Sequence, residues 1–154
     1  MLFWACHTAL GEIFIVEENN KITHLCFQKQ SFMTPDMMQK TPLLNDAFEQ
    51  LQEYLAGKRK IFNLPLCPIG TAFQKRVWLE LLNIPYGETA SYKEIAEKIG
   101  CAKAYRAVGL ANNKNPIPIF VPCHRVIGSN GKLVGYAGGL NIKSQLLNIE
   151  ALNK

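Results

Sequence analysis

SYKEIAEKIGCAKAYRAVGLANN, residues 91–113, predicts two helices joined by a tight turn. Ser91 and Glu94 match the capping box, in which each side chain satisfies a backbone N–H at the start of a helix. The first helix is expected over residues 92–99 and the second over residues 103–113. The pair has the outline of a helix-turn-helix, although two helices packed together for purely structural reasons have the same pattern.

The second helix of this pair carries small side chains and one long cation. Its long cation is Arg106, and the small residues in and just before it are Ala102, Ala104, Ala107, Gly109 and Ala111. Small side chains let a helix approach a partner closely, and polar side chains that could read base edges in the major groove are scarce. We therefore expect this helix to lie against a nucleic-acid backbone or minor groove without reading sequence.

The positive charge of the chain is concentrated around these helices. The formal net charge is +5, of which residues 1–70 contribute −1 and residues 71–154 contribute +6. No acidic residue lies between Glu97 and Glu150. Such a stripe suits a polyanionic partner, although an ordinary solvated basic surface explains the charge alone equally well. The cations in the stripe are Lys98, Lys103, Arg106, Lys114, Arg125, Lys132 and Lys143.

Length and composition limit the class of protein. The 154 residues, 48% hydrophobic and 19% charged, fit a globular protein and exclude disorder, collagen and a coiled coil. Residues 1–10 lack the features of a signal peptide, and no apolar run reaches ~18 residues. Five scattered cysteines suit reduced thiols better than disulfides. We expect a cytoplasmic protein without membrane contact.

Two domains are predicted, over residues 1–66 and 67–154. The first is expected to be a small antiparallel sheet with a helix, and the second to be mainly helical, which makes the fold class α+β. A proline- and glycine-containing segment, residues 65–70, marks the boundary. The predicted elements besides the helix pair are strands over 12–16 and 21–27, a helix through residues 44–55, and a helix over 73–83.

The strongest chemical signal is Pro122-Cys123-His124-Arg125-Val126. A cysteine is a competent nucleophile only as the thiolate, and a neighbouring imidazole or cation lowers the pKa of its thiol. The alternative is a buried cysteine beside an unrelated histidine, because consecutive side chains often diverge. The pentapeptide alone leaves both interpretations open.

Together with its surroundings, the pentapeptide resembles the signature of the O6-alkylguanine-DNA alkyltransferases. The resemblance covers residues 70–150, whereas the first third of the chain resembles that family only in outline, as a strand-rich domain. It implies DNA repair by direct reversal, a winged helix-turn-helix-like DNA-binding unit in the second domain, and no cofactor. The matching segments are Gly70 to Gln74, Val77-Trp78, Ile84 to Gly87, Ser91-Tyr92, Arg106 to Gly109, Asn115-Pro116, Val121 to Gly128 and Gly135 to Leu140.

The resemblance also implies a role for each matching residue. Cys123 matches the alkyl acceptor, His124 its base acting through a water, and Glu150 the carboxylate that orients the histidine. Asn115 matches the residue that ties the recognition helix to the active-site turn, and Tyr92 a residue near the flipped base and its 3′ phosphate. The remaining expected contacts are Arg106, which fills the gap left in the duplex, Ala107 and Arg125 on DNA, and Asn112, Val126, Tyr136, Ala137 and Gly138 in the substrate pocket.

The expected partner is double-stranded DNA, approached through the minor groove by a monomer. O6-alkylguanine is the expected substrate, and O4-alkylthymine stays open as a second one. Because the O6 carbon is crowded by stacking inside the duplex, the base must be flipped out before an in-line attack. A thioether on Cys123 is stable, so one transfer per molecule is expected.

Other functions and ligands are weaker alternatives. A lesion binder without transfer would not need Cys123, and a cysteine hydrolase built on Cys123, His124 and Glu150 would leave the basic stripe without a purpose. A zinc site is not expected, because the candidate ligands match no zinc spacing and neighbouring strand residues point to opposite faces. Those candidates are Cys6, His7, His24 and Cys26.

Overall fold

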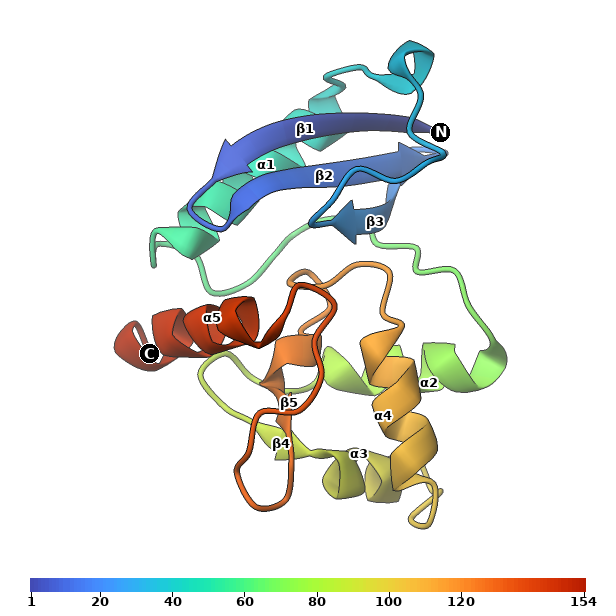
Figure 1. Cartoon of the computed structure of the whole chain (residues 1–154), viewed down its shortest axis with the longest axis vertical. Helices are drawn as coiled ribbons and strands as arrows, with labels where there is room; N and C mark the ends of the chain where they lie inside the picture. The colour runs from blue at the N-terminus through green and yellow to red at the C-terminus, as the bar shows by residue number, and fades with distance from the viewer. The chain divides into compact units, whose positions relative to one another are not determined.

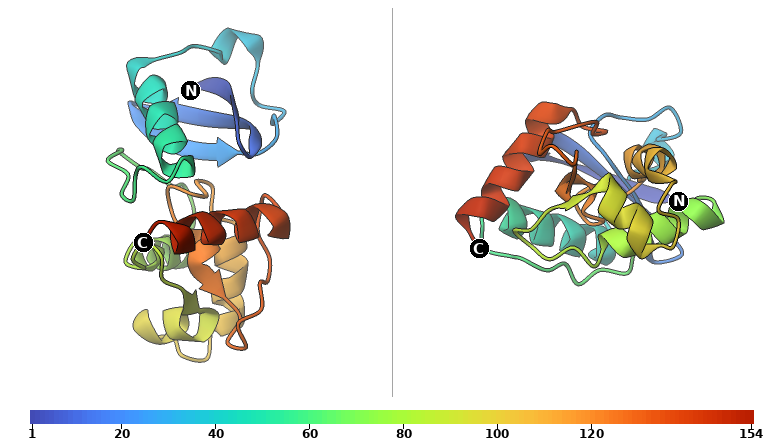
Figure 2. Two further views of the ribbon diagram at one scale, coloured as in Figure 1. Left: turned by 90° about the vertical axis from the view of Figure 1, so that its left-hand side faces the viewer. Right: turned by 90° about the horizontal axis from the view of Figure 1, so that it is seen from below.

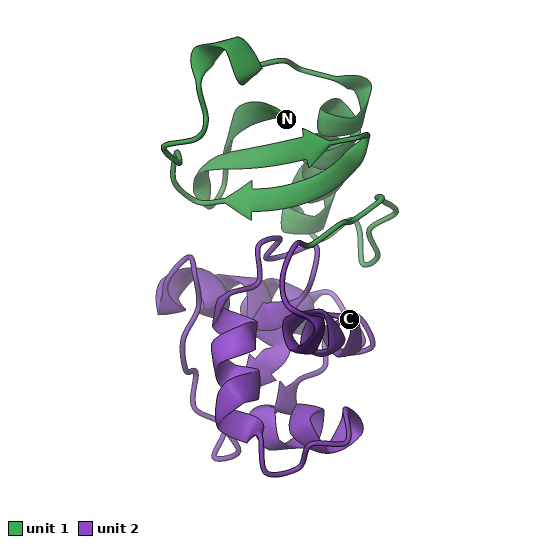
Figure 3. Cartoon of the chain, turned by 90° about the vertical axis from the view of Figure 1, so that its right-hand side faces the viewer, with its two compact units in different colours: residues 1–68 green, residues 69–154 purple.

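The computed structural model describes residues 1–154 and divides into two compact units, Met1–Pro68 and Ile69–Lys154 (Figure 3). An antiparallel sheet and a long helix form the first unit, and helices dominate the second (Figure 1). The predicted α+β class is therefore confirmed. None of the helices combines the length and the apolar character that a membrane span requires.

Three strands form the sheet of the first unit. They are β1 (Leu2–Thr8), β2 (Gly11–Glu18) and β3 (Lys21–Cys26), paired antiparallel in the order β1-β2-β3. The β2–β3 hairpin turns at Asn19 and Asn20, whose φ values are 53° and 62°. Two successive positive φ angles give the turn a twist that matches the flanking strands. β1 was not predicted, because its sequence LFWACHT lacks a regular alternation of apolar and polar residues.

Both faces of the central strand β2 are covered. Helix α1 (Pro42–Leu55) packs against the sheet (Figure 2). Thr41 caps its N-terminus, because the Thr41 hydroxyl accepts a hydrogen bond from the Leu44 backbone N–H. A short 3₁₀ turn, η1 (Pro35–Met37), precedes α1. Phe14 and Val16 of β2 belong to a separate apolar cluster, which also contains Phe3 and Met33.

The second unit is built on α2 (Ala72–Leu81), α3 (Tyr92–Lys98) and α4 (Tyr105–Asn113). These helices begin and end within two residues of the predicted bounds. The capping box of Ser91 and Glu94 forms as expected, and an equivalent box starts α2. Helices α2 and α3 both pack against α4. The buried face of α4 therefore rests on the other two helices.

Side-chain contacts to backbone fix this helical packing. The Trp78 indole N–H on α2 donates to the Ala111 carbonyl oxygen on α4 at 2.8 Å. The Arg76 guanidinium donates to the Ile99 carbonyl oxygen at the end of α3. Gly100 follows with φ 78°, a left-handed conformation that ends the helix and starts the turn towards α4.

A small parallel strand pair and a final helix complete the second unit. β4 (Ala90–Ser91) pairs with β5 (Val126–Ile127), and a 3₁₀ turn, η2 (Cys123–Arg125), leads into β5. Helix α5 (Leu140–Leu152) packs against η2. α5 was not predicted, because it follows Gly139 without a side-chain cap and so lacks the usual start signal.

Replacing Trp78 with phenylalanine is expected to lower the free energy of unfolding by about 1–3 kcal/mol, through loss of the hydrogen bond to Ala111 and of packing volume. Calorimetric melting curves of the full chain would measure the change. Leu79→Ala, at the next residue and 67% exposed, is the control and should change the free energy by less than about 0.5 kcal/mol. Equal effects of the two substitutions would contradict the importance of the Trp78–Ala111 contact.

Candidate active site

The backbone before Cys123 is bent sharply. Pro122 has φ −79° and ψ 63°, and the Cys123 N–H donates to the Val121 carbonyl oxygen at 2.8 Å, which makes this an inverse γ-turn. Ile119, buried in the same segment, has φ 75°. A β-branched residue is strained at this angle and persists there only where its surroundings enforce it. The surroundings of Cys123 are therefore firmly held.

Two buried asparagines supply much of that restraint. The Asn115 side-chain N–H₂ donates to the Val121 carbonyl oxygen at 2.9 Å, and its Oδ1 accepts the Ile117 N–H at 3.0 Å. The Asn112 side chain donates to the Cys123 carbonyl oxygen at 3.3 Å. Asn112 lies on α4, and Asn115 lies two residues beyond the end of that helix. The exposed helix and the cysteine turn are thus joined by direct hydrogen bonds.

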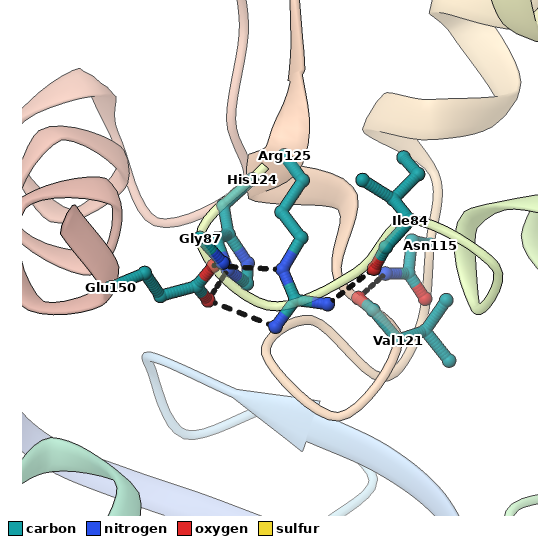
Figure 4. Close-up of polar contacts among 7 residues, drawn as sticks. All are labelled: Ile84, Gly87, Asn115, Val121, His124, Arg125 and Glu150. Carbon is teal, nitrogen blue, oxygen red and sulfur yellow. Dashed lines mark hydrogen bonds and ion pairs between the residues drawn. The ribbon is translucent and has the colours of Figure 1, made fainter. Parts of the chain in front are cut away.

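Glu150 collects donors from separate segments (Figure 4). Its Oε2 lies 2.6 Å from His124 Nε2, and its Oε1 accepts the Gly87 backbone N–H at 3.0 Å. Arg125 donates to both carboxylate oxygens, from Nε at 2.9 Å and Nη2 at 3.1 Å. His124, Arg125 and Glu150 are all buried. The arginine and the carboxylate form a bidentate, charge-assisted pair inside the protein.

Arg125 is not available to DNA, which corrects the expected contact. The residue is 7% exposed, and its guanidinium also donates from Nη1 to the Ile84 carbonyl oxygen at 2.7 Å. Its charge is therefore used inside the protein. The sequence pattern led to a wrong prediction because a cation within a basic stripe is expected to face solvent. Its partner Glu150 lies 25 positions away, and the pattern does not indicate that contact.

His124 is set up as a neutral base. Burial lowers its pKa, and the hydrogen bond to Glu150 opposes that effect. Because an ionised carboxylate only accepts hydrogen bonds, the proton of the neutral ring is placed on Nε2 and the lone pair on Nδ1. The imidazole can then accept a proton at Nδ1 while Glu150 stabilises the cation that results.

The Cys123 thiol is protonated in this state, contrary to the expectation from its neighbours. It is 2% exposed, and burial raises its pKa to about 11, opposed by a hydrogen bond from Asn115 and the charge of Lys143. The groups that lower the pKa of the thiol are Asn115 and Lys143, and the effect of burial exceeds theirs. The site stores a neutral thiol that needs a base to become a nucleophile.

Lys143 is a site residue that the sequence prediction missed. Its fully buried ammonium donates to the carbonyl oxygens of Val126 at 2.7 Å, Val134 at 3.0 Å and Gly135 at 3.3 Å. The Tyr92 hydroxyl also donates to the Val134 carbonyl oxygen, at 2.7 Å. These contacts tie the glycine-rich segment 128–139 to α5 and to Tyr92. Lys143 shares the buried face of α5 with Glu150, a spacing that a prediction of α5 would have revealed.

The remaining predicted residues fall in different environments. Val126 and Tyr136 are buried, whereas Ala137 is exposed and Gly138 half-buried on the segment 128–139. Arg106 and Ala107 are exposed on α4. Half-buried Tyr92 lies beside Gly109, where an added Cβ would meet its ring at 3.7 Å.

The cysteines and histidines of the first unit do not form a metal cage. Cys6 and Cys26 belong to the outer strands β1 and β3, with β2 between them. No group of three or more histidine, cysteine, aspartate or glutamate side chains gathers in a way that could hold a metal ion.

Comparisons with known proteins cover the whole chain. The family model of the 6-O-methylguanine DNA methyltransferase ribonuclease-like domain matches residues 2–68, and that of the DNA binding domain matches residues 72–152. The constitutive methylated-DNA--protein-cysteine methyltransferase of Bacillus subtilis (strain 168) is 49% identical, over 98% of this chain and 96% of the relative. The methylated-DNA--protein-cysteine methyltransferase of Methanosarcina barkeri is 48% identical over 99% of both chains.

A solved structure agrees with these matches. The crystal structure of Mycobacterium tuberculosis OGT in complex with DNA superposes with a TM-score of 0.91 at 44% identity, over 99% of this chain and 94% of that one.

In the absence of DNA, Cys123 is expected to resist alkylation by iodoacetamide at pH 7–9, because a pKa raised to about 11 leaves the thiol protonated until the pH approaches that value. Peptide mapping by mass spectrometry across a pH series would measure the labelling. The exposed Cys67 provides an internal control and should be labelled first. Half-complete labelling of Cys123 below pH 9, at a rate matching that of Cys67, would mean that the pKa of the thiol is not raised.

Proposed function

The chain belongs to the 6-O-methylguanine DNA methyltransferase family, and we propose that it repairs DNA by moving an alkyl group from O6 of guanine to the sulfur of Cys123. The observation that carries this assignment is the buried pair of His124, in the turn that holds the cysteine, and Glu150 on α5, 2.6 Å apart. The pair provides a base and its stabilising carboxylate where a neutral thiol must be activated.

The chemical step exchanges one bond for another. The Cys123 sulfur attacks the alkyl carbon opposite the O6 oxygen, the new S–C bond forms, and the C–O6 bond breaks with its electron pair going to the guanine. His124 takes the thiol proton at Nδ1, through a bridging water, and that proton ends on the restored guanine. The product carries a stable thioether, so each molecule reacts once.

Charged residues inside the site favour this step. Burial, and to a smaller degree the charge of Arg125, lowers the pKa of His124, so the histidine starts neutral and can accept a proton. Lys143 lies close enough to Cys123 for its charge to favour the thiolate as it forms. Asn112 and Asn115 hold the backbone around the sulfur. His124 is thus a neutral base that can accept the proton of Cys123, and the thiol is ionised only during the reaction.

Access to the sulfur requires an opening of the resting site. Cys123 is 2% exposed, and the Tyr92 hydroxyl bonds the segment 128–139 at Val134. An incoming base must replace that contact, after which Tyr92 is placed to meet the base and its 3′ phosphate. Tyr136 to Gly138 belong to the same segment and would line the opened pocket together with Val126.

DNA is the proposed partner, held through α4 in the minor groove. The exposed Ala107 permits close approach, and the exposed Arg106 is long enough to fill the space of a flipped nucleotide. Residues 87–150 supply every proposed catalytic group, so a monomer is sufficient. Five free cysteines favour a reducing compartment, and we place the protein in the cytoplasm.

Incubation with duplex DNA carrying one O6-methylguanine is expected to place one methyl on Cys123 and then stop. Cys123→Ala should abolish the gain in mass while leaving the affinity for the duplex unchanged, because the DNA contacts lie elsewhere. Cys67→Ala, which removes an exposed thiol, should retain full transfer. Intact-mass and binding measurements would test this. Binding without a gain in mass would instead indicate a protein that only marks lesions. Neither binding nor a gain in mass would indicate a hydrolase.

Arg106→Ala is expected to slow transfer from duplex DNA by about tenfold or more, since flipping a base costs a few kcal/mol and ~1.4 kcal/mol corresponds to a factor of ten. Its reaction with free O6-methylguanine should stay unchanged. Single-turnover rates on both substrates would measure the two effects, with Lys103→Ala as a control that removes an exposed charge near α4. A parallel loss on the free base would show that Arg106 does not act through flipping.

A further inference from the structure

The outward face of α4 carries Arg106 and Leu110, and Lys114, the residue that caps the end of the helix, continues this face; the three side chains form a ridge. They are spaced by four residues, which places them on one side of the helix. Leu110 is 65% exposed and lies at the centre of this side. Val108, on the opposite side of the helix, is fully buried. A large apolar side chain therefore stands between two cations on the surface.

Leu110 does not belong to the buried side of α4. The buried side of α4 consists of Val108, Ala111 and Asn112, and this side receives the contacts from the rest of the unit, including the Trp78 hydrogen bond to Ala111. Single exposed leucines are ordinary on protein surfaces. Leu110 differs because a cation lies one turn away on each side and no acidic residue lies between Glu97 and Glu150. The two cations of the ridge are complementary in charge to a polyanion, and Leu110 at its centre is suited to contact with an apolar surface.

We propose that Leu110 rests on the floor of the minor groove beside the lesion and disfavours a G·C pair at the position it covers. The inference relies on the proposed function, since it places α4 in that groove. All base pairs present acceptors on the groove floor, but only G·C adds the guanine N2 amino group, a donor that projects into the groove. Leucine offers no acceptor, so the amine under it loses water without gaining a partner.

The affected position lies close to the damaged base. One helical turn separates Arg106 from Leu110, about 5.4 Å along the helix axis, and neighbouring base pairs are about 3.4 Å apart. With Arg106 in the gap of the flipped nucleotide, Leu110 covers a pair within two steps of the lesion. Because the ridge runs in one direction, the preference is confined to one side of the damaged base.

The inference is tested with duplexes that differ only in the N2 amine. Each carries one O6-methylguanine, with a G·C or an inosine·C pair one or two steps away on either side, since inosine lacks the amine and keeps the other groove atoms. Single-turnover methyl transfer to Cys123 is measured by mass for the wild type, Leu110→Ala and the control Leu79→Ala, whose leucine is 67% exposed on α2. Melting curves verify that all three proteins are folded.

The wild type and Leu79→Ala are expected to react about tenfold faster on the inosine duplex at one position on one side. Leu110→Ala should reduce that ratio to less than about twofold, because alanine leaves room for a hydrated amine. The inosine pair is also weaker, but this affects all three proteins equally and cancels in the comparison. An unchanged ratio in Leu110→Ala, or no preference in the wild type, would overturn the inference while transfer itself continued. Absence of transfer on every duplex would instead overturn the proposed function.

Discussion

The buried carboxylate of Glu150 is the charge on which the rest of the site depends. It accepts hydrogen bonds from Gly87, His124 and Arg125, which belong to segments far apart in the chain. A carboxylate removed from water is costly unless it is paired and hydrogen-bonded, and deleting one partner of a buried pair costs about 3–5 kcal/mol. One side chain therefore fixes α5, the cysteine turn and the loop before β4 in a single arrangement. The orientation of the histidine is a consequence of this arrangement.

The same arrangement explains why the site is inert until a substrate arrives. Arg125 neutralises Glu150, burial keeps His124 uncharged, and burial raises the pKa of Cys123. The cation next to the thiol, Lys143, is occupied with three backbone carbonyl oxygens. A permanently ionised cysteine would react with any electrophile in the cell. A neutral, enclosed thiol that ionises only during transfer avoids this loss, which matters for a protein that reacts once.

Local signals in the sequence predicted the helices well, but they predicted the hydrogen bonds and ion pairs of the site less well. The capping box at Ser91 marks α3 because the hydrogen bonds involved span only three residues. Arg125 was assigned to DNA because its true partner lies 25 positions away, and neither periodicity nor composition indicates such a contact. Lys143 escaped notice for the related reason that α5 has no capping side chain, so its buried face was not recognised. The resemblance named Glu150 and His124, whereas their burial and the raised pKa of Cys123 are properties of the packed structure.

The wide separation of the Glu150 partners also sets the order in which the site is assembled during synthesis. Gly87 precedes Glu150 by 63 positions and His124 precedes it by 26. Since a growing polypeptide leaves the ribosome from its N-terminus, the cysteine and its base emerge well before the carboxylate that orients them. Until α5 docks, the imidazole lacks its fixed tautomer and the cysteine turn lacks one wall. Base-assisted transfer from a flipped guanine therefore becomes possible only after α5 has docked.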